Sequence, residues 1–299
     1  MRIQELKTSS LKLAYEEGGP KKGDPIVLVH GWPDSPRTFD KILPALHAAG
    51  YRTIVPYLRG YGHSEFRSPL FGRKPRRTGQ PVALAQDVID LADALKLPCF
   101  DLVGHDWGAR TAYALAALFP RRLKRMVTLS VPFAPGPAKP PVAAQARAFW
   151  YQWYLCTLPG EKAFRADPVA YCKQQWVTWG PEGWYTAQEL ASAAQSWTGK
   201  DFADVVLQYY RSRWGHAQLD PSYDVLQVRF EAATTLDIPT LLLHGLQDHC
   251  TLPETTDGAG RYFTNGYRRV LLEGVGHFPQ REAPKLVAEE ILRHLLEPA

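Results

Sequence analysis

The chain has 299 residues, 45% of them hydrophobic, which is enough for one sizeable globular core and an inserted segment. No apolar run approaches the ~20 residues of a membrane span, no secretory signal is visible, and four scattered cysteines favour free thiols in a reducing cytoplasm. The net charge of +5 owes much of its excess to residues 67–77, which we interpret as a solvated loop because no nucleic-acid motif accompanies them.

Runs that suit buried strands alternate with runs that suit helices along the first 131 residues. This alternation is typical of an α/β fold with a mostly parallel sheet and helices on both faces, in which active residues gather at the carboxyl ends of strands. In chain order the expected elements are an edge hairpin over 1–20 turned at Ser9 and Ser10, a strand at 26–30, a helix after Pro36, a strand at 51–56, a helix over 81–97, a strand at 99–103, a helix over 109–119 and a strand at 123–131.

The middle of the chain has a different composition. Five prolines within 132–141 indicate a stiff linker, and the stretch 134–230 holds seven of the nine tryptophans but no alternation of strands and helices. The alternation resumes near Leu236. We therefore predict a helical cap domain over 134–230, inserted into a core domain made of 1–133 and 231–299. An aromatic cap can exclude water and favour an apolar substrate, although such rings can also serve only to hold the cap to the core.

The run GHDWG at 104–108 joins an apolar strand to a helix rich in alanine and leucine that ends before Pro120. It has the form of the sharp turn that exposes a nucleophile in serine hydrolases, with Asp106 where those enzymes carry serine. A carboxylate is ionised at neutral pH and needs no base to activate it. We therefore predict that Asp106 attacks a saturated carbon bearing a leaving group and forms an ester that water cleaves. The alternative is a solvated aspartate in an ordinary strand–helix turn.

Two further candidate catalytic residues follow later strands. Asp248 comes after the strand expected at 239–244, and His277 comes after the next strand, so both should lie at the same edge of the sheet as Asp106. His277 would take a proton from water, while Asp248 would orient the imidazole and stabilise its charged form. Since no Asp or Glu occurs between 129 and 160, Asp248 is the only well-placed acid.

The run HGWP at 30–33 follows an apolar strand. Cleavage of an ester requires backbone N–H groups aimed at its carbonyl oxygen. We expect one such group from Trp107 and the other from Trp32, with Pro33 fixing the loop, and a cis peptide bond is one way to do so. The alternative is a plain turn closed by an aromatic side chain.

These motifs make the chain resemble the α/β-hydrolase superfamily and, within it, the epoxide hydrolases. Haloalkane dehalogenases share the aspartate turn and often the tryptophan after it. The resemblance covers most of the chain outside its middle third, and one departure is Ala109, where many relatives have a glycine and the added methyl group could slightly reshape the turn. The matching runs are HGWP at 30–33, LRGYGHS at 58–64, GHDWG at 104–108, HGLQD at 244–248 and GVGHFPQREAP at 274–284.

The resemblance also implies two cap tyrosines that protonate the opening epoxide oxygen. Tyr151, which precedes a glutamine, matches the first, and Tyr210, which precedes an arginine, matches the second. A phenol with a pKa near ~10 stays protonated at pH 7, and a departing halide needs no proton, so a pair of tyrosines favours an epoxide over an alkyl halide. Otherwise these tyrosines are packing residues of the cap. The residues expected to line the pocket, including the alternative tyrosines, are Gln152, Tyr154, Tyr209 and Pro33.

We therefore predict an enzyme of the α/β-hydrolase fold that converts an apolar or aromatic epoxide to a vicinal diol through a covalent ester on Asp106. The expected partners are a small-molecule epoxide and water, with no cofactor, metal, nucleic acid or membrane span, and a homodimer is left open. One alternative is a haloalkane dehalogenase that uses the same nucleophile. The other is a hydrolase-like receptor for a hydrophobic small molecule, which would not turn over an epoxide.

Overall fold

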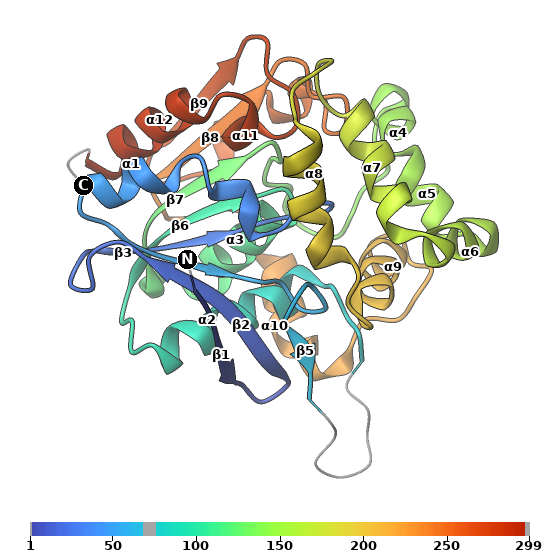
Figure 1. The fold of residues 1–299 in the computed structure, drawn as a ribbon, viewed down its shortest axis with the longest axis horizontal. Coiled ribbons are helices and arrows are strands. Elements are labelled where there is room, and N and C mark those ends of the chain that lie inside the picture. Colours follow the sequence, from blue (N-terminus) through green and yellow to red (C-terminus); the bar gives the residue numbers. More distant parts are fainter. Residues whose placement is uncertain (1, 68–75, 297–299) are drawn as a thin grey trace.

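The computed structural model describes residues 2–67 and 76–296, with a twisted sheet at its centre (Figure 1). Nine strands of these residues form the sheet in the order β1-β2-β4-β3-β6-β7-β8-β9, with the short β5 paired to β2. The strands are β1 (Ile3–Lys7), β2 (Leu11–Gly18), β3 (Pro25–Val29), β4 (Arg52–Pro56), β5 (Glu65–Phe66), β6 (Phe100–His105), β7 (Leu123–Leu129), β8 (Thr240–Gly245) and β9 (Tyr267–Leu272).

The neighbouring strands β4, β3, β6, β7, β8 and β9 run parallel to one another. In contrast, β2 pairs antiparallel with β1, β4 and β5. The central strands β6 and β8 are buried along their whole length, as expected for parallel strands covered on both faces. The register places Gly104 of β6 between Val29 of β3 and Thr128 of β7. These three strands therefore end together, and the loops that follow them share one edge of the sheet.

Helices cover both faces of the sheet (Figure 1). Alternate residues of β3 enter opposite hydrophobic clusters, because successive side chains of a strand point to opposite faces. Ile26 and Leu28 pack with α1 and α12, while Val27 and Val29 pack with α2 and α3. The helices of this part are α1 (Leu43–Ala48), α2 (Pro81–Ala94), α3 (Trp107–Leu118), α10 (Asp224–Ala232), α11 (Pro279–Glu282) and α12 (Pro284–Leu296), with 3₁₀ turns η1 (Pro36–Phe39), η2 (Pro120–Arg122), η4 (Pro221–Tyr223), η5 (Pro253–Thr256) and η6 (Ala259–Tyr262).

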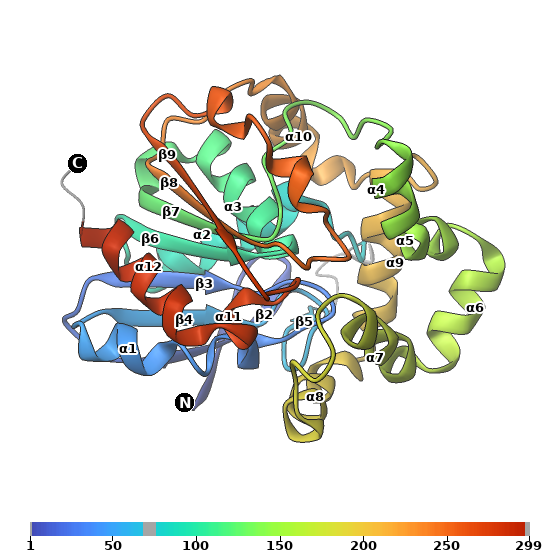
Figure 2. The same cartoon turned by 90° about the horizontal axis from the view of Figure 1, so that it is seen from above.

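A second group of helices lies between β7 and β8 in the chain and beside the sheet in space, on the right of Figure 2. Indole groups tie this cap to the core, since Trp176 Nε1 donates to the carbonyl oxygen of Pro33 at 2.7 Å and Trp197 Nε1 to that of Asp34 at 3.0 Å. The elements are α4 (Ala143–Ala148), α5 (Trp150–Leu155), α6 (Leu158–Ala166), α7 (Pro168–Thr178), α8 (Ala187–Ala194), η3 (Gln195–Trp197) and α9 (Phe202–Arg213).

The fold class expected from the sequence is confirmed, with local differences at the ends of elements. The helix expected after Pro36 is a 3₁₀ turn followed by α1, and α2 ends three residues earlier than expected because Lys96 adopts a left-handed backbone with φ of 56°. The proposed cap range of 134–230 includes most of α10, although this helix packs against α2 and α3 of the core. The division into two domains stays a prediction.

The positively charged stretch over residues 67–77 is only partly described, because Arg73 and Lys74 lie outside the described residues. Of its other members, Arg77 pairs with Asp201 at 2.8 Å, and Arg76 donates to the carbonyl oxygen of Leu219 at 3.1 Å. Across 2–67 and 76–296, no helix has both the length and the apolar character needed to cross a membrane.

A buried ion pair joins the loop after β4 to α2. Arg59 Nε and Nη2 donate to the two carboxylate oxygens of Asp87, each at 2.7 Å, and the guanidinium also donates to the carbonyl oxygen of Ala83 and the hydroxyl of Tyr223. Both charged side chains are at least nine-tenths buried. Removal of one partner from such a pair leaves an uncompensated buried charge, whereas replacement of both by apolar groups is often tolerated.

We therefore expect Arg59→Met to lower the free energy of unfolding by about 3–5 kcal/mol, measured by urea denaturation followed by tryptophan fluorescence. The double variant Arg59→Met with Asp87→Leu should recover much of that loss. Lys124→Met, which breaks the exposed pair with Asp24, is the matched control and should cost no more than about 1 kcal/mol. A loss from Arg59→Met as small as the control's would contradict a structural role for the buried pair.

Candidate active site

Asp106 occupies a strained turn between β6 and α3. Its backbone has φ of 52° and ψ of −111°, a region that a non-glycine residue rarely adopts, and this turns its carboxylate away from the strand. The flanking glycines allow the elements to meet: a Cβ on Gly108 would lie 1.9 Å from the carbonyl oxygen of Val29, and one on Gly104 would lie 2.3 Å from that of Gly108. The sequence GHDWG therefore holds a buried carboxylate where three parallel strands end.

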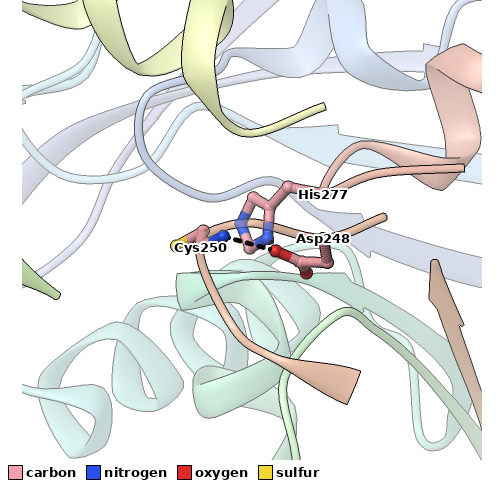
Figure 3. A group of neighbouring side chains, drawn as sticks. All are labelled: Asp248, Cys250 and His277. Carbon is pink, nitrogen blue, oxygen red and sulfur yellow. Dashed lines mark hydrogen bonds and ion pairs between the residues drawn. The ribbon is translucent and has the colours of Figure 1, made fainter. Parts of the chain in front are cut away.

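Asp248 and His277 reach the same place from the loops after β8 and β9. Figure 3 shows their side chains pointing toward one another, with His277 Nδ1 2.8 Å from Asp248 Oδ2. The other ring nitrogen, Nε2, lies 3.5 Å from Asp106 Oδ2. The structure thus brings together the three residues that the sequence proposed as nucleophile, acid and base.

Asp248 is held by more donors than His277 alone. The N–H groups of Cys250 and Thr251 donate to Asp248 Oδ1, both at 2.8 Å, and His244 Nε2 lies 3.1 Å from Oδ2. Sequence reasoning missed these contacts, and a possible signal was the spacing of four residues between His244 and Asp248 across the end of a strand. A carboxylate with this many partners keeps a fixed orientation toward His277.

The three groups are buried and shift one another's pKa values. Burial alone would raise the pKa of Asp248, but the charge of His277 and hydrogen bonds from His244 and His277 hold it well below its usual value. Burial alone would lower the pKa of His277, but Asp248 and Asp106 together raise it to about 10. The pKa of Asp106 is likewise lowered against the effect of burial, chiefly by His277. At neutral pH the site therefore holds an imidazolium between two carboxylates.

A backbone donor contacts the carboxylate oxygen of Asp106 that does not face His277. The N–H of Trp32 donates to Asp106 Oδ1 at 2.9 Å, and the peptide bond between Trp32 and Pro33 is cis. Trp107 is the first residue of α3, where backbone N–H groups have no partner within the helix. One carboxylate oxygen of Asp106 thus accepts from the Trp32 amide, and the other lies beside the imidazolium.

Both proposed proton donors face this turn from the cap. Gln152 Nε2 donates to the Tyr151 hydroxyl at 2.8 Å, and Trp107 Nε1 donates to the Tyr210 hydroxyl at 3.2 Å. The two phenol rings lie with centroids 5.4 Å apart and nearly perpendicular. Burial raises the pKa of each phenol well above its usual value, so each remains protonated at neutral pH. Tyr209 instead stacks on the indole of Trp107, with ring centroids 3.8 Å apart.

These groups line one small cavity. Two of the residues expected in the pocket are not among its lining: Pro33, whose carbonyl oxygen accepts from Trp176, and Tyr154, whose ring is about one-third exposed. Arg110 was missed although it lies in the first turn of α3, four residues after Asp106, a spacing that the sequence displays. The lining residues are Asp106, Trp107, Arg110, Phe149, Tyr151, Gln152, Tyr209, Tyr210, Arg213 and Thr251.

One group of side chains has ligand types that could hold a metal ion. Asp248, Cys250 and His277 each offer one ligand atom, and these atoms lie within 4.8 Å of one another (Figure 3). Two of these atoms, Asp248 Oδ2 and His277 Nδ1, already share a hydrogen bond of 2.8 Å. A cation bound there would have to replace that bond, so the arrangement suits an oriented imidazole better than a metal centre.

The alpha/beta hydrolase fold family model matches residues 24–284, so the chain belongs to that family. A crystal structure of a candidate epoxide hydrolase from Klebsiella pneumoniae is 33% identical, covers 98% of this chain and 97% of its own, and has a TM-score of 0.90. Epoxide hydrolase A from Mycobacterium tuberculosis is 25% identical over 96% of this chain and 95% of its own length. Within the α/β-hydrolases, the chain belongs to the epoxide hydrolase family and is a hydrolytic enzyme.

The fold by itself does not select a reaction. A candidate acyltransferase from Salmonella enterica has a TM-score of 0.81 at 23% identity, with 98% of this chain and 94% of that chain covered. Such a likeness concerns the arrangement of helices and strands only. The chemistry of the protein is therefore determined by the residues at the site.

The pKa of His277 depends on two carboxylates, and this dependence is measurable. We expect Asp106→Asn to lower the pKa of His277 from about 10 toward its usual value, because one of the two negative charges is lost while burial still favours the neutral imidazole. Nitrogen-15 NMR of the imidazole across a pH series measures the shift. Glu189→Gln, which removes a carboxylate on α8 that pairs with Lys41 outside the cavity, is the control and should leave the value unchanged. An unchanged pKa in Asp106→Asn would show that the two groups are not coupled.

Proposed function

We propose that the protein hydrolyses an apolar or aromatic epoxide to a vicinal diol through a covalent ester on Asp106. One observation carries the proposal: an ionised carboxylate on a sharp turn shares a small cavity with two buried, protonated phenols. Ring opening needs a nucleophile for carbon and a proton for oxygen, and this cavity supplies both. The epoxide hydrolases among the relatives support the reaction class.

In the first step Asp106 Oδ2 attacks a ring carbon. The other carboxylate oxygen accepts the Trp32 N–H and becomes the ester carbonyl oxygen, so the two oxygens are already distinguished before substrate binds. The carbon–oxygen bond of the ring breaks, and its electron pair passes to the epoxide oxygen. Tyr151 or Tyr210 donates a proton to that oxygen, and the resulting phenolate regains a proton from the imidazolium of His277.

Ester formation changes the properties of His277. The ester carries no charge, so His277 keeps only Asp248 as a negative neighbour and its pKa falls. Because the imidazolium has also given up its proton, a neutral imidazole now faces the ester beside Asp248, which holds the ring in place through Nδ1. The same side chain that stabilises the ionised nucleophile thereby becomes a base once the nucleophile has reacted.

In the second step His277 takes a proton from water, and the hydroxide adds to the ester carbonyl carbon. The N–H groups of Trp32 and Trp107 stabilise the negative oxygen of this adduct. As the adduct collapses, the bond between the carbonyl carbon and the diol oxygen breaks. That oxygen takes the proton of the new carboxyl group, which returns Asp106 as a carboxylate and leaves His277 protonated, as at the start.

Two alternatives use the same cavity. A haloalkane dehalogenase needs N–H donors for a departing halide, but the indole N–H of Trp107 is engaged by the hydroxyl of Tyr210. Release of halide from a simple alkyl halide, without diol from styrene oxide, would favour that reaction. A receptor for a hydrophobic small molecule would bind styrene oxide without repeated turnover.

We expect His277→Gln to accumulate the ester, because ring opening needs the carboxylate whereas hydrolysis needs the base. Intact-protein mass spectrometry after mixing with styrene oxide should show a mass increase equal to the whole epoxide, and peptide mapping should place it on Asp106. The double variant His277→Gln with Asp106→Ala is the control and should show no increase. Absence of the ester from His277→Gln while the wild type produces diol would overturn the covalent route.

We expect Tyr151→Phe and Tyr210→Phe each to slow ring opening by about 10²-fold or more, which is typical for loss of a positioned proton donor. Stopped-flow tryptophan fluorescence during a single turnover of styrene oxide measures this step, and the double variant should be slower still. Tyr154→Phe changes a partly exposed tyrosine of the same helix as Tyr151 and is the matched control. If both single variants match this control, the tyrosines only pack the cap.

A further inference from the structure

Two arginines, Arg110 and Arg213, line the cavity beside Asp106. Eight of the cavity's ten lining residues are buried, and the other two, Arg110 and Arg213, are partly exposed. Arg110 comes from α3 of the core, whereas Arg213 is the last residue of α9 in the cap. One guanidinium group from the core and one from the cap therefore line the same cavity as the nucleophile.

Arg110 and Arg213 have no carboxylate partner among the described residues, unlike Arg165 and Arg211 of the cap. Arg165 and Arg211 share the carboxylate of Glu161, each at 2.8 Å. Arg213 instead stacks on the ring of Trp214 at 5.0 Å, and its buried Nε atom lacks a hydrogen-bond partner. The side chain of Arg110 likewise makes no ion pair with any described carboxylate.

The pKa of Arg213 is consistent with its lack of a carboxylate partner. Burial and the neighbouring charge of Arg110 lower the pKa of Arg213 to about 10, a direction that arginine takes only when its charge is poorly compensated. Burial acts to lower the pKa of Arg110, but Tyr209 and Asp106 raise it overall, and the charge of Asp106 disappears when an ester forms. Two cations that share one cavity gain most from an anion brought in by the ligand.

We propose that Arg110 and Arg213 bind a carboxylate group of the substrate and present its epoxide ring to Asp106, so that the preferred substrates are epoxides that carry a carboxylate. A guanidinium presents paired donors in a plane that match the two oxygens of a carboxylate. Trp107, Phe149 and the tyrosines form the aromatic wall beside the two arginines. This inference rests on the proposed function and names its substrate class.

A different role would have different consequences. Burial raises the pKa of Tyr209, and the charges of Arg110 and Arg213 act against that rise, so the arginines could serve only to tune a phenol. Such tuning acts on every substrate equally. A binding role for a carboxylate acts only on charged substrates, which separates the two by comparison of matched molecules.

The experiment compares phenylglycidate, which carries a carboxylate, with phenylglycidamide, its neutral amide of similar shape. We expect the wild type to hydrolyse the anion with a kcat/KM at least about 10-fold higher. Arg213→Gln and Arg110→Gln should each lower kcat/KM for the anion by about 10- to 100-fold, the range for loss of a hydrogen bond to a charged group. Both variants should change the value for the amide less than about threefold.

Two further variants test the role of charge and serve as a control. Arg213→Lys retains the positive charge and should recover part of the preference for the anion. Arg147→Gln removes an exposed arginine of the cap helix α4 and should leave both substrates unaffected. Equal losses on both substrates, or a wild type that does not prefer the anion, would overturn the proposal while leaving epoxide hydrolysis intact.

A binding measurement separates failure of this inference from failure of the proposed function. Cinnamate and cinnamamide lack the epoxide ring and cannot react, and their binding is followed by quenching of tryptophan fluorescence. Tighter binding of cinnamate, lost in Arg213→Gln, supports the anion site even if no epoxide is hydrolysed, in which case the proposed function fails alone. Equal binding of the two compounds overturns the anion site.

Discussion

The candidate active site depends on a balance of charge among three buried side chains. Two carboxylates, Asp106 and Asp248, share one imidazolium, and each oxygen that faces the protein interior has a donor from Trp32, Cys250 or Thr251. Buried charges are costly unless they are paired and hydrogen-bonded, so the loops that carry these donors cannot move independently. A rigid parallel sheet is what holds them, because the residues that must converge all follow strands that end at one edge.

The common edge at which the parallel strands end explains which site residues could be predicted from the sequence. Asp106, Asp248 and His277 were placed together by a simple rule, that carboxyl ends of neighbouring parallel strands meet, and the fold class followed from the same pattern. The cap obeys no comparable rule, since the side of each helix that faces the cavity depends on packing between helices. Tyr154 was therefore expected in the pocket but lies partly exposed, and Arg213 was not noticed although it lines the cavity.

The tryptophans of the cap have separate tasks. Trp176 and Trp197 donate hydrogen bonds to backbone carbonyls of the loop after β3, the loop that also carries the Trp32 N–H. In the core, Trp107 contributes an indole that positions a phenol and a face on which Tyr209 stacks. The aromatic composition that marked the cap in the sequence thus reflects attachment to the core at least as much as the lining of the cavity.

The insertion of the cap helices between β7 and β8 affects the order in which the site residues are synthesised. These adjacent strands pair Met126 with Thr240, so the ribosome must deliver more than a hundred residues before the sheet can continue. The strand and turn that hold Asp106 emerge first, while Asp248 and His277 emerge only after the cap. A nascent chain therefore carries its reactive carboxylate without the imidazole that completes it, and chemical competence arrives with the last segment to be synthesised.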